Sequence, residues 1–188
     1  MRTVVCVSGA SGAAYAARLL QVLPGTKVLV VTDSGKQLIE HEFGPFAQFA
    51  ALADEVYGDA DLGAPVSSGS APFDAAVIVP CSISSIGKIA AGIADTLVTR
   101  VATVCLKERR TLVLVPRETP LGLIHLRNLV TITEAGGIVL YAAPGFYHHP
   151  KSVDDLVDFV VGKILNTLGH DGSALLKRWE GMPSSLPR

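Results

Sequence analysis

Serine and glycine residues cluster where the first predicted strand ends. The segment Ser8-Gly9-Ala10-Ser11-Gly12 directly follows a β-branched run and precedes a helical pattern. Small residues let a ligand approach the backbone, and the amides at a helix start suit a phosphate. The segment lacks the spacing of a dinucleotide fingerprint and the lysine of a P-loop. A phosphate site and a plain tight turn therefore both remain open.

A second polar segment, Pro80-Cys81-Ser82-Ile83-Ser84-Ser85, follows another buried run. Its hydroxyls suit either the capping of a helix that begins near Ser84 or contact with a ligand. Because no base or charge adjoins Cys81 in the sequence, the thiol is interpreted as an inert core residue and not as a nucleophile.

Charged residues flank a later predicted strand. Arg117 and Glu118 follow it between two prolines, where an arginine can pair with a phosphate and a carboxylate can carry a proton. Lys107 closes a predicted helix, so a ligand role and simple interaction with the helix dipole weigh equally. Arg109 and Arg110 are interpreted as loop ion pairs.

An aromatic segment, Phe146-Tyr147-His148-His149, lies downstream. Tyr147 offers a flat ring with a hydroxyl, which suits an allylic or aromatic substrate or a core position. Two adjacent histidines without an acid at ligand spacing argue against zinc, and no acidic cluster suits magnesium. The sequence also lacks a Gly-x-Ser-x-Gly elbow. We therefore predict no metal and no serine-hydrolase triad.

These residues must be positioned by a sheet and its helices. Apolar runs predict strands at residues 3–7, 27–32, 75–79, 111–115 and 137–140, with a short extra strand near 55–57. Helical patterns cover residues 12–22, 34–42, 84–91, 96–107, 121–135 and 152–168. This alternation predicts an α/β fold with a doubly wound parallel sheet. The long connection 43–74 includes a Ser/Gly segment that its composition marks as mobile.

Composition limits the class of protein. The chain has 188 residues, 49% of them hydrophobic, and a net charge of −1, which predicts one packed domain with no bias toward nucleic acid or a membrane surface. No apolar run is long enough to span a bilayer, and the first residues are typical of a strand and not of a signal peptide. Three cysteines without metal or redox spacing favour a reduced, cytoplasmic setting.

Taken together, several segments resemble the UbiX-type flavin prenyltransferases, from the first strand to Trp179. The resemblance is carried by Ser8-Gly9-Ala10-Ser11-Gly12-Ala13-Ala14-Tyr15, Ser68-Gly69-Ser70, Pro80-Cys81-Ser82, Leu106-Lys107-Glu108-Arg109-Arg110, Val115-Pro116-Arg117-Glu118-Thr119-Pro120 and Ala143-Pro144-Gly145-Phe146-Tyr147-His148. It implies one flavodoxin-like, three-layer flavoprotein domain over residues 1–188. A C-terminal helix and tail, about 170–188, would close the active site.

The resemblance also implies an activity. Dimethylallyl monophosphate would alkylate reduced FMN at N5 and then C6, without a metal, to give prenylated FMN for a UbiD-type decarboxylase. The enzyme would be a homo-oligomer, a dodecamer, with active sites at subunit contacts. Whether the donor is a monophosphate or a diphosphate stays open.

Residue roles follow from the same resemblance. The implied FMN-binding residues are Gly9, Ala10, Ser11, Thr32, Ser82, Ile83, Ser84, Ser85 and Arg117. The implied substrate-binding residues are Arg100, Lys107, Arg117, Tyr147, Lys163 and Trp179. The implied catalytic residues are Ser11, Glu42, Glu118 and Tyr147, with the two acids handling protons and Ser11 lying near flavin N5. Thr32 stands where the family usually has serine, and Lys163 where it often has arginine, so the phosphate would be held less firmly.

Two other functions remain open. FMN-dependent cysteine decarboxylases share the fold, but they rely on a histidine early in the chain, whereas here the early histidine is His41 and the segment 67–72 has none. A subunit that binds FMN without chemistry is the second alternative. Pure storage would not require Glu42, Lys107, Glu118 and Tyr147 together.

Overall fold

Valine, leucine and isoleucine fill the strands in uninterrupted runs. The computed structural model describes residues 1–176, 179 and 181. Its strands are β1 (Arg2–Val7), β2 (Thr26–Val31), β3 (Glu55–Gly58), β4 (Ala75–Cys81), β5 (Thr111–Pro116) and β6 (Ile138–Val139). Every residue of β4 is buried, as expected for a strand covered on both faces.

Helices connect these strands. They are α1 (Ala13–Val22), α2 (Asp33–Glu42), α3 (Phe46–Ala50), α4 (Ile83–Ala90), α5 (Leu97–Glu108), α6 (Leu123–Glu134) and α7 (Val153–Thr167), with a short 3-10 helix, η1 (Pro65–Ser67). The chain forms two compact units, Met1–Ala142 and the part from Ala143 onward. Each unit is considered by itself below.

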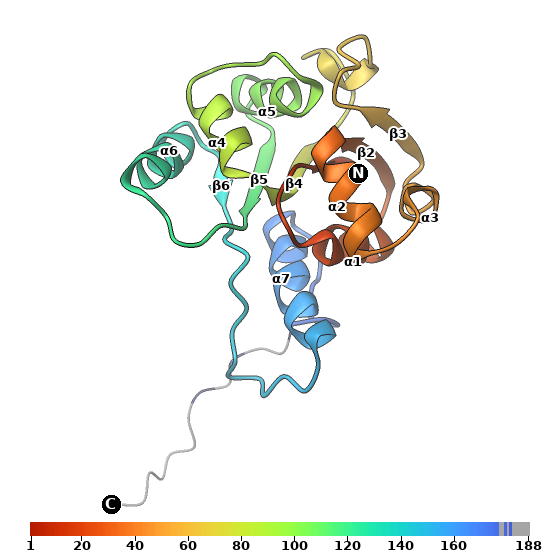
Figure 1. Ribbon diagram of the computed structural model, residues 1–188, viewed down its shortest axis with the longest axis vertical. Helices are drawn as coiled ribbons and strands as arrows, with labels where there is room; N and C mark the ends of the chain where they lie inside the picture. Colours follow the sequence, from red (N-terminus) through yellow and green to blue (C-terminus); the bar gives the residue numbers. More distant parts are fainter. Residues whose placement is uncertain (177–178, 180, 182–188) are drawn as a thin grey trace, which may run out of the picture. The chain divides into compact units, whose positions relative to one another are not determined.

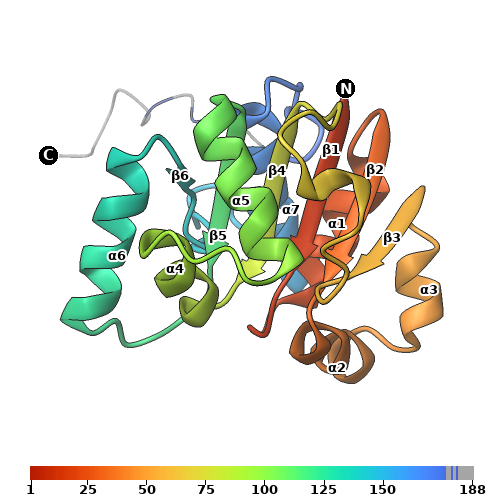
Figure 2. The ribbon, with the colours of Figure 1, turned by 90° about the horizontal axis from the view of Figure 1, so that it is seen from above.

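The first unit is built on one parallel sheet with the order β3-β2-β1-β4-β5-β6. Figure 2 shows α3 at the β3 end of this sheet and α6 at the β6 end. The chain leaves β1 toward β2 and leaves β4 toward β5, so the direction of winding reverses between two neighbouring strands. The predicted doubly wound α/β fold is confirmed.

Alternating strand residues form the core on one face of this sheet. A cluster of buried residues joins this face to α4 and α5, and α6 packs beside α4 (Figure 1). Its strand members include Val4, Cys6, Val28, Val30, Ala76, Ile78, Leu112 and Leu114. The period of two along each strand separates this face from the one that carries Val5, Val77 and Val113.

The predicted strands and helices are confirmed within two residues at each end. The connection 43–74 holds more structure than predicted, because it contains α3 and η1 as well as the expected strand β3. Its Ser/Gly segment was expected to be mobile from its composition. Instead, Val66 is fully buried and Phe73 is 4% exposed, so these side chains fasten the segment to the core.

The second unit contains α7. Ser152 and Asp155 form a capping box at the start of this helix, and Gly169 follows its end with φ 83°, as the sequence predicts. Residues 170–176 form turns and no helix, whereas 177, 178, 180 and 182–188 lie outside the described residues. The assignment of residues 1–188 to one domain with a closing tail stays a prediction.

None of the helices in the described part of the chain is both long and apolar enough to cross a membrane.

Ser8 ties the ends of β1 and β4 together. Its side chain, 1% exposed, donates a hydrogen bond to the Pro80 carbonyl at 3.1 Å and accepts one from the Ser82 amide at 2.7 Å. The Ser8 amide also donates to the Pro80 carbonyl at 3.3 Å. One buried hydroxyl therefore fixes the relative position of the two loops that leave the centre of the sheet.

Replacing Ser8 by alanine should destabilise the protein, because the Ser82 amide would lose its acceptor in a buried setting. We expect a loss of about 1–3 kcal/mol, or a Tm lower by about 3–10 °C. Thermal unfolding followed by circular dichroism measures this change. Ser70→Ala, at an exposed serine, is the matched control and should cost about 0.5 kcal/mol or less. Equal Tm values for the two variants would contradict the bracing role.

Candidate active site

The reversal of winding between β1 and β4 defines the candidate site. In open parallel sheets, ligands bind beyond the carboxyl ends of the strands at such a reversal, because the flanking loops diverge there. The loop 8–12 after β1 and the start of α4 after β4 meet at this place, held by Ser8. The structure thus brings the two predicted ligand loops together.

The loop after β1 lies close against α2. A Cβ built on Gly9 would come within 2.5 Å of Ser34 Oγ and 2.9 Å of its Cβ, so any other residue would displace Ser34. Thr32 caps α2, since its hydroxyl accepts a hydrogen bond from the Gly35 amide at 2.9 Å. The hydroxyls of Thr32 and Ser34 lie 3.4 Å apart, which places two polar side chains beside the loop.

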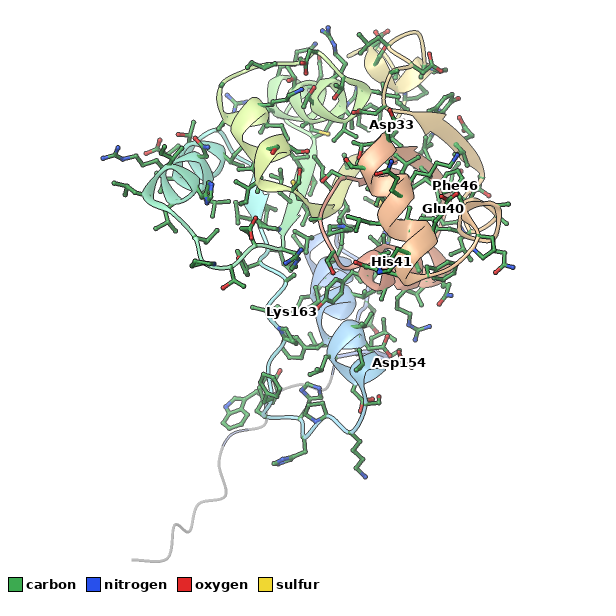
Figure 3. The ribbon with its side chains drawn as sticks, viewed as in Figure 1. Asp33, Glu40, His41, Phe46, Asp154 and Lys163 are labelled. Carbon is green, nitrogen blue, oxygen red and sulfur yellow. The ribbon has the colours of Figure 1, made fainter. Side chains whose placement is uncertain are left out.

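Glu42, the last residue of α2, reaches the start of α1. Its carboxylate accepts hydrogen bonds from the Gly12 amide at 2.8 Å and the Ala13 amide at 2.9 Å. Figure 3 labels its neighbours Glu40 and His41 on this helix. The amides that the sequence suggested for a ligand phosphate therefore already serve an anion of the chain itself, and a phosphate at this loop must use other donors.

The environment of Glu42 keeps its carboxyl ionised. Burial raises the pKa, and this is the largest single effect. The hydrogen bonds from the two amides and the Ser11 side chain, together with the charge of Arg117, outweigh it and lower the pKa below its ordinary value. Glu42 is therefore ionised at neutral pH and anchors the start of α1.

The start of α4 presents hydroxyls at the same edge of the sheet. Ser82 caps the helix by accepting a hydrogen bond from the Ser85 amide at 3.2 Å, and the two hydroxyls lie 3.0 Å apart. Ser84 is exposed, whereas Ile83 packs against the core. Capping accounts for Ser82, and the exposed first turn leaves Ser84 accessible to a ligand.

Arg117 reaches from the end of β5 across β4 to the loop after β1. Its Nε donates to the Ser11 carbonyl at 3.2 Å, and its backbone amide donates to the Cys81 carbonyl at 3.4 Å. The half-buried guanidinium is thereby fixed at the reversal of winding, and the Ser11 carbonyl occupies its Nε–H group. Its other N–H groups have the fork geometry that recognises a phosphate.

Glu118 follows Arg117 and is held through its backbone. The Tyr141 hydroxyl donates to the Glu118 carbonyl and accepts from the Glu118 amide at 3.3 Å. The Glu118 carboxylate accepts a hydrogen bond from the Thr119 amide at 2.9 Å. Glu118 therefore stands at the same edge of the sheet as Arg117, with a fixed backbone.

Lys107 lies at the opposite edge of the sheet. It belongs to the last turn of α5, which ends just before β5 begins, whereas Arg117 follows the end of β5. A strand of this length spans about 20 Å. Within one chain, Lys107 and Arg117 therefore do not share a site.

Lys107 is held in a small cluster of its own. Its ammonium pairs with the neighbouring Glu108 carboxylate and lowers the pKa of that carboxyl. Gly69 lies close to the pair, since a Cβ built on it would come within 2.5 Å of Lys107 Nζ. Arg110 donates to the Gly69 carbonyl at 2.6 Å and lies over the Phe73 ring at 4.4 Å. Arg110 was predicted to form an ion pair within a loop. Instead it holds the loop at Gly69 and Phe73 through a hydrogen bond and a cation–π contact.

Arg100 shares the outward side of α5 with Lys107. Seven residues are close to two helical turns, so the two cations lie on one side of the helix about 10 Å apart. Arg100 is exposed in the first turn of α5. Arg100 therefore shares one side of α5 with Lys107, and its part in the site stays a prediction.

The second unit carries the predicted aromatic residues. The Tyr147 ring meets Phe159, His148 and Trp179 edge-on, with centroids 5.8, 5.8 and 5.4 Å away. His148 stacks on Phe159 at 5.3 Å. Tyr147, 40% exposed, and Trp179, 55% exposed, are thus already neighbours within this unit.

Lys163 belongs to the exposed side of α7 (Figure 3). The buried side of the helix carries Val157, Val160, Val161, Ile164 and Leu165. The position of Lys163 fits a cation offered to a ligand, and its role stays a prediction.

The three cysteines are buried free thiols. Burial raises the pKa of Cys81 and of Cys105, so both stay protonated and unreactive, as predicted for Cys81. In the described part of the chain, no three His, Cys, Asp or Glu side chains are grouped as metal ligands.

Three contributors were not predicted from the sequence. Ser8 appeared only as part of a small-residue loop, although a hydroxyl at the end of a buried strand is a usable signal. Ser34 and Tyr141 gave no signal, because their roles depend on contacts with residues that lie far away in the sequence.

Comparison with known proteins identifies the family. The Flavoprotein family matches residues 1–165. A flavin prenyltransferase UbiX of Thermoplasma acidophilum is 53% identical over 181 residues, which cover 95% of this chain and 100% of that protein.

Two solved structures are similar over nearly the full length. AnUbiX (PadA1), in complex with FMN and dimethylallyl pyrophosphate, has a TM-score of 0.92 at 40% identity and covers 97% of this chain and 98% of its own. A dodecameric FMN-dependent UbiX-like decarboxylase from Escherichia coli O157:H7 has a TM-score of 0.91 at 41% identity, with 97% and 100% covered. The chain therefore belongs to the flavoprotein family and, within it, to the UbiX flavin prenyltransferases.

Proposed function

We propose that the protein joins a dimethylallyl group, taken from a dimethylallyl phosphate, to N5 and C6 of reduced FMN. The product, prenylated FMN, would serve a UbiD-type decarboxylase. One observation supports the proposal beyond family membership. The Arg117 guanidinium donates a hydrogen bond to the Ser11 carbonyl at the reversal of winding. The proposed phosphate-binding cation therefore lies against the loop that is proposed to bind the flavin. The three buried free thiols are in keeping with work in the cytoplasm.

The residues at the carboxyl edge fit FMN. Gly9 lies close against α2, so this part of the loop presents only small residues beside the hydroxyls of Thr32 and Ser34. On the other side of the site, Ser84 and Arg117 supply hydrogen-bond donors. The Glu42 carboxylate occupies the start of α1, so the FMN phosphate must be bound by the hydroxyl and guanidinium donors. When bound, reduced FMN supplies the electron-rich atoms N5 and C6.

The chain's own groups assist departure of the phosphate. A monophosphate leaves easily only when its charge is neutralised and a proton is supplied. In this proposal Arg117 provides the charge and Glu118 provides the proton, which is supported by the hold of Tyr141 on the Glu118 backbone next to Arg117. Ionised Glu42, hydrogen-bonded to Ser11, is placed to accept the proton that the flavin loses.

The site as proposed requires more than one copy of the chain. Lys107, in the last turn of α5, lies at the opposite edge of the sheet from Arg117, so it can serve such a site only in a neighbouring copy. The dodecameric E. coli relative shows that such assembly occurs in close relatives. We infer a homo-oligomer in which the Arg117 half of one site faces the Lys107 half of another copy.

The two alternatives are less favoured. His41 is exposed on α2, and the packed segment 67–72 contributes no histidine to stand in for the one that cysteine decarboxylases use. A storage subunit would not explain a second set of cations in addition to Arg117.

A direct test is the mass of the flavin. The full chain, incubated without oxygen with FMN, dithionite and dimethylallyl monophosphate, should yield FMN enlarged by one dimethylallyl group. Arg117→Ala should lose most of this product, because neither the FMN nor the leaving phosphate is then neutralised. A parallel reaction with the diphosphate identifies the donor. Unchanged FMN with both donors would overturn the proposed function.

Glu42→Gln tests the anchor at the start of α1. The variant keeps an acceptor oxygen but loses the charge, so we expect a cost of about 0.5 kcal/mol, seen as a Tm about 1–2 °C lower at pH 7, and weaker FMN binding. Because the folded pKa of Glu42 is lowered, its contribution is complete above its ordinary pKa and fades as the pH falls. The Tm values of variant and wild type should therefore converge as the pH falls through the lowered pKa of Glu42. A constant difference across that range would contradict the electrostatic role.

Mixed assemblies test the shared site. Lys107→Ala and Arg117→Ala should each be nearly inactive alone. Co-expressed in equal amounts, they should recover about a quarter of wild-type activity, because one site in four then draws Arg117 from one variant and Lys107 from the other. If each chain held a complete site, mixing would restore nothing.

A further inference from the structure

Helix α6 carries apolar side chains on two opposite sides. Ile132 is 1% exposed and packs in the core, as expected for a helix that covers a sheet. Leu123 lies nine residues earlier, about two and a half turns away, so it points to the other side of the helix. A helix that is apolar on both sides ordinarily has two partners, and the sheet accounts for one of them.

The outer side of α6 is a regular stripe. Leu123, Leu126 and Val130 follow the i, i+3, i+7 spacing of a packed helix face, yet they are 61, 46 and 56% exposed. Beside them lies a depression of about 390 Å³, lined by Leu126, Leu129, Val130, Thr133, Glu134 and Val139. Contiguous exposed apolar surface of this kind marks a protein contact.

The stripe runs between the two half-sites. α6 starts at Leu123, five residues after Glu118 at the carboxyl edge of the sheet. At its other end, a Cβ on Gly136 would lie 4.0 Å from Arg109 Nη1, which places this end beside the Lys107 cluster. A second chain packed antiparallel along α6 would therefore set its Lys107 end beside the Arg117 end of the first.

The charges along α6 suit such a pairing. Arg127 precedes Val130 by three residues, and Glu134 follows it by four. The two are seven residues apart, so they lie on the same flank of the stripe. In an antiparallel pair centred near Val130, Arg127 of each copy would face Glu134 of the other. Such a surface is complementary to itself, as a two-fold contact requires.

We propose that the stripe Leu123–Leu126–Val130 is a self-complementary contact that binds α6 of a second copy of the chain. The inference rests on the proposed function in one respect, because the shared site supplies the need for a second copy. It adds the surface, its antiparallel orientation and its charge pairing. The contact would also set the end of one chain that carries Lys107 near the end of the other that carries Arg117.

The test is the molar mass of the purified full chain by size-exclusion chromatography with light scattering. Val130→Glu should reduce the mass by at least half at micromolar concentration, because the contact would bury a carboxylate without a partner. Thr131→Glu is the matched control. It places the same group one residue along, on another exposed side of α6 and equally near Glu134, and should keep the wild-type mass.

Two further variants separate loss of the contact from loss of the fold. Leu123→Glu places an acid in the first turn of α6, where it stabilises the helix itself, so the mass should fall while helicity by circular dichroism is kept. Arg127→Glu should weaken assembly by opposing Glu134 of the other copy, and Arg127→Glu with Glu134→Arg should restore it. Failure of this restoration would overturn the antiparallel pairing.

The outcomes distinguish this contact from the function. If Val130→Glu and Leu123→Glu keep the wild-type mass, the stripe is not the contact, whether or not the wild type prenylates FMN. If the wild type is itself monomeric, the contact is equally overturned. If the wild type assembles and the variants dissociate but no prenylated FMN forms, the contact stands and the proposed activity fails.

Discussion

The candidate site depends on how the loop after β1 is held at the centre of the sheet. Three groups from separate parts of the chain fix this loop: Ser8 ties it to the end of β4, the Glu42 carboxylate holds the first amides of α1, and Arg117 donates to the Ser11 carbonyl. These bonds position Gly9 and Ala10, which have no polar side chain of their own to anchor them. Catalytic geometry on such a loop requires rigid support from neighbouring elements, and here each support comes from a different strand or helix.

The same arrangement decides where a phosphate can bind. A helix start is an ordinary anion site, and sequence alone makes α1 the natural choice. Because Glu42 already satisfies the Gly12 and Ala13 amides, the dipole of α1 is used to fix the loop and to hold that carboxylate ionised. Under the proposed function, anion binding then falls to Arg117 and the hydroxyls. The Thr32 hydroxyl is the N-cap of α2. Serine and threonine both serve as N-caps, so a threonine where the family usually has serine leaves the cap intact.

Sequence reasoning recovered the order of strands and helices because buried parallel strands give uninterrupted apolar runs and the helices between them carry clear caps. It missed α3 and η1 because five-residue and three-residue helices are too short for a period to show. The polar segments after β1, β4 and β5 were recognised from the sequence, and they lie together because the carboxyl ends of parallel strands share one edge. Their supports, such as Tyr141 on Glu118 and Ser34 against Gly9, could not be predicted, because each depends on contacts between distant parts of the chain. The family resemblance named Arg100 and Lys107 beside Arg117, whereas the structure shows that one chain cannot bring Lys107 and Arg117 together.

That separation follows from the direction of α5, and it has an energetic consequence. A crossover helix runs antiparallel to its strands, so a cation in its last turn always lies at the amino edge of the sheet, away from ligands at the carboxyl edge. In a single chain, the charge of Lys107 is paired with Glu108. The positive charge at the carboxyl edge is then that of the Arg117 guanidinium. A phosphate dianion next to an FMN phosphate then meets too little positive charge to leave readily. The proposed assembly would supply the missing cations without changing any residue in the loop after β1. Activity should therefore depend on protein concentration wherever assembly does, because the free energy of subunit association and that of the complete site are linked.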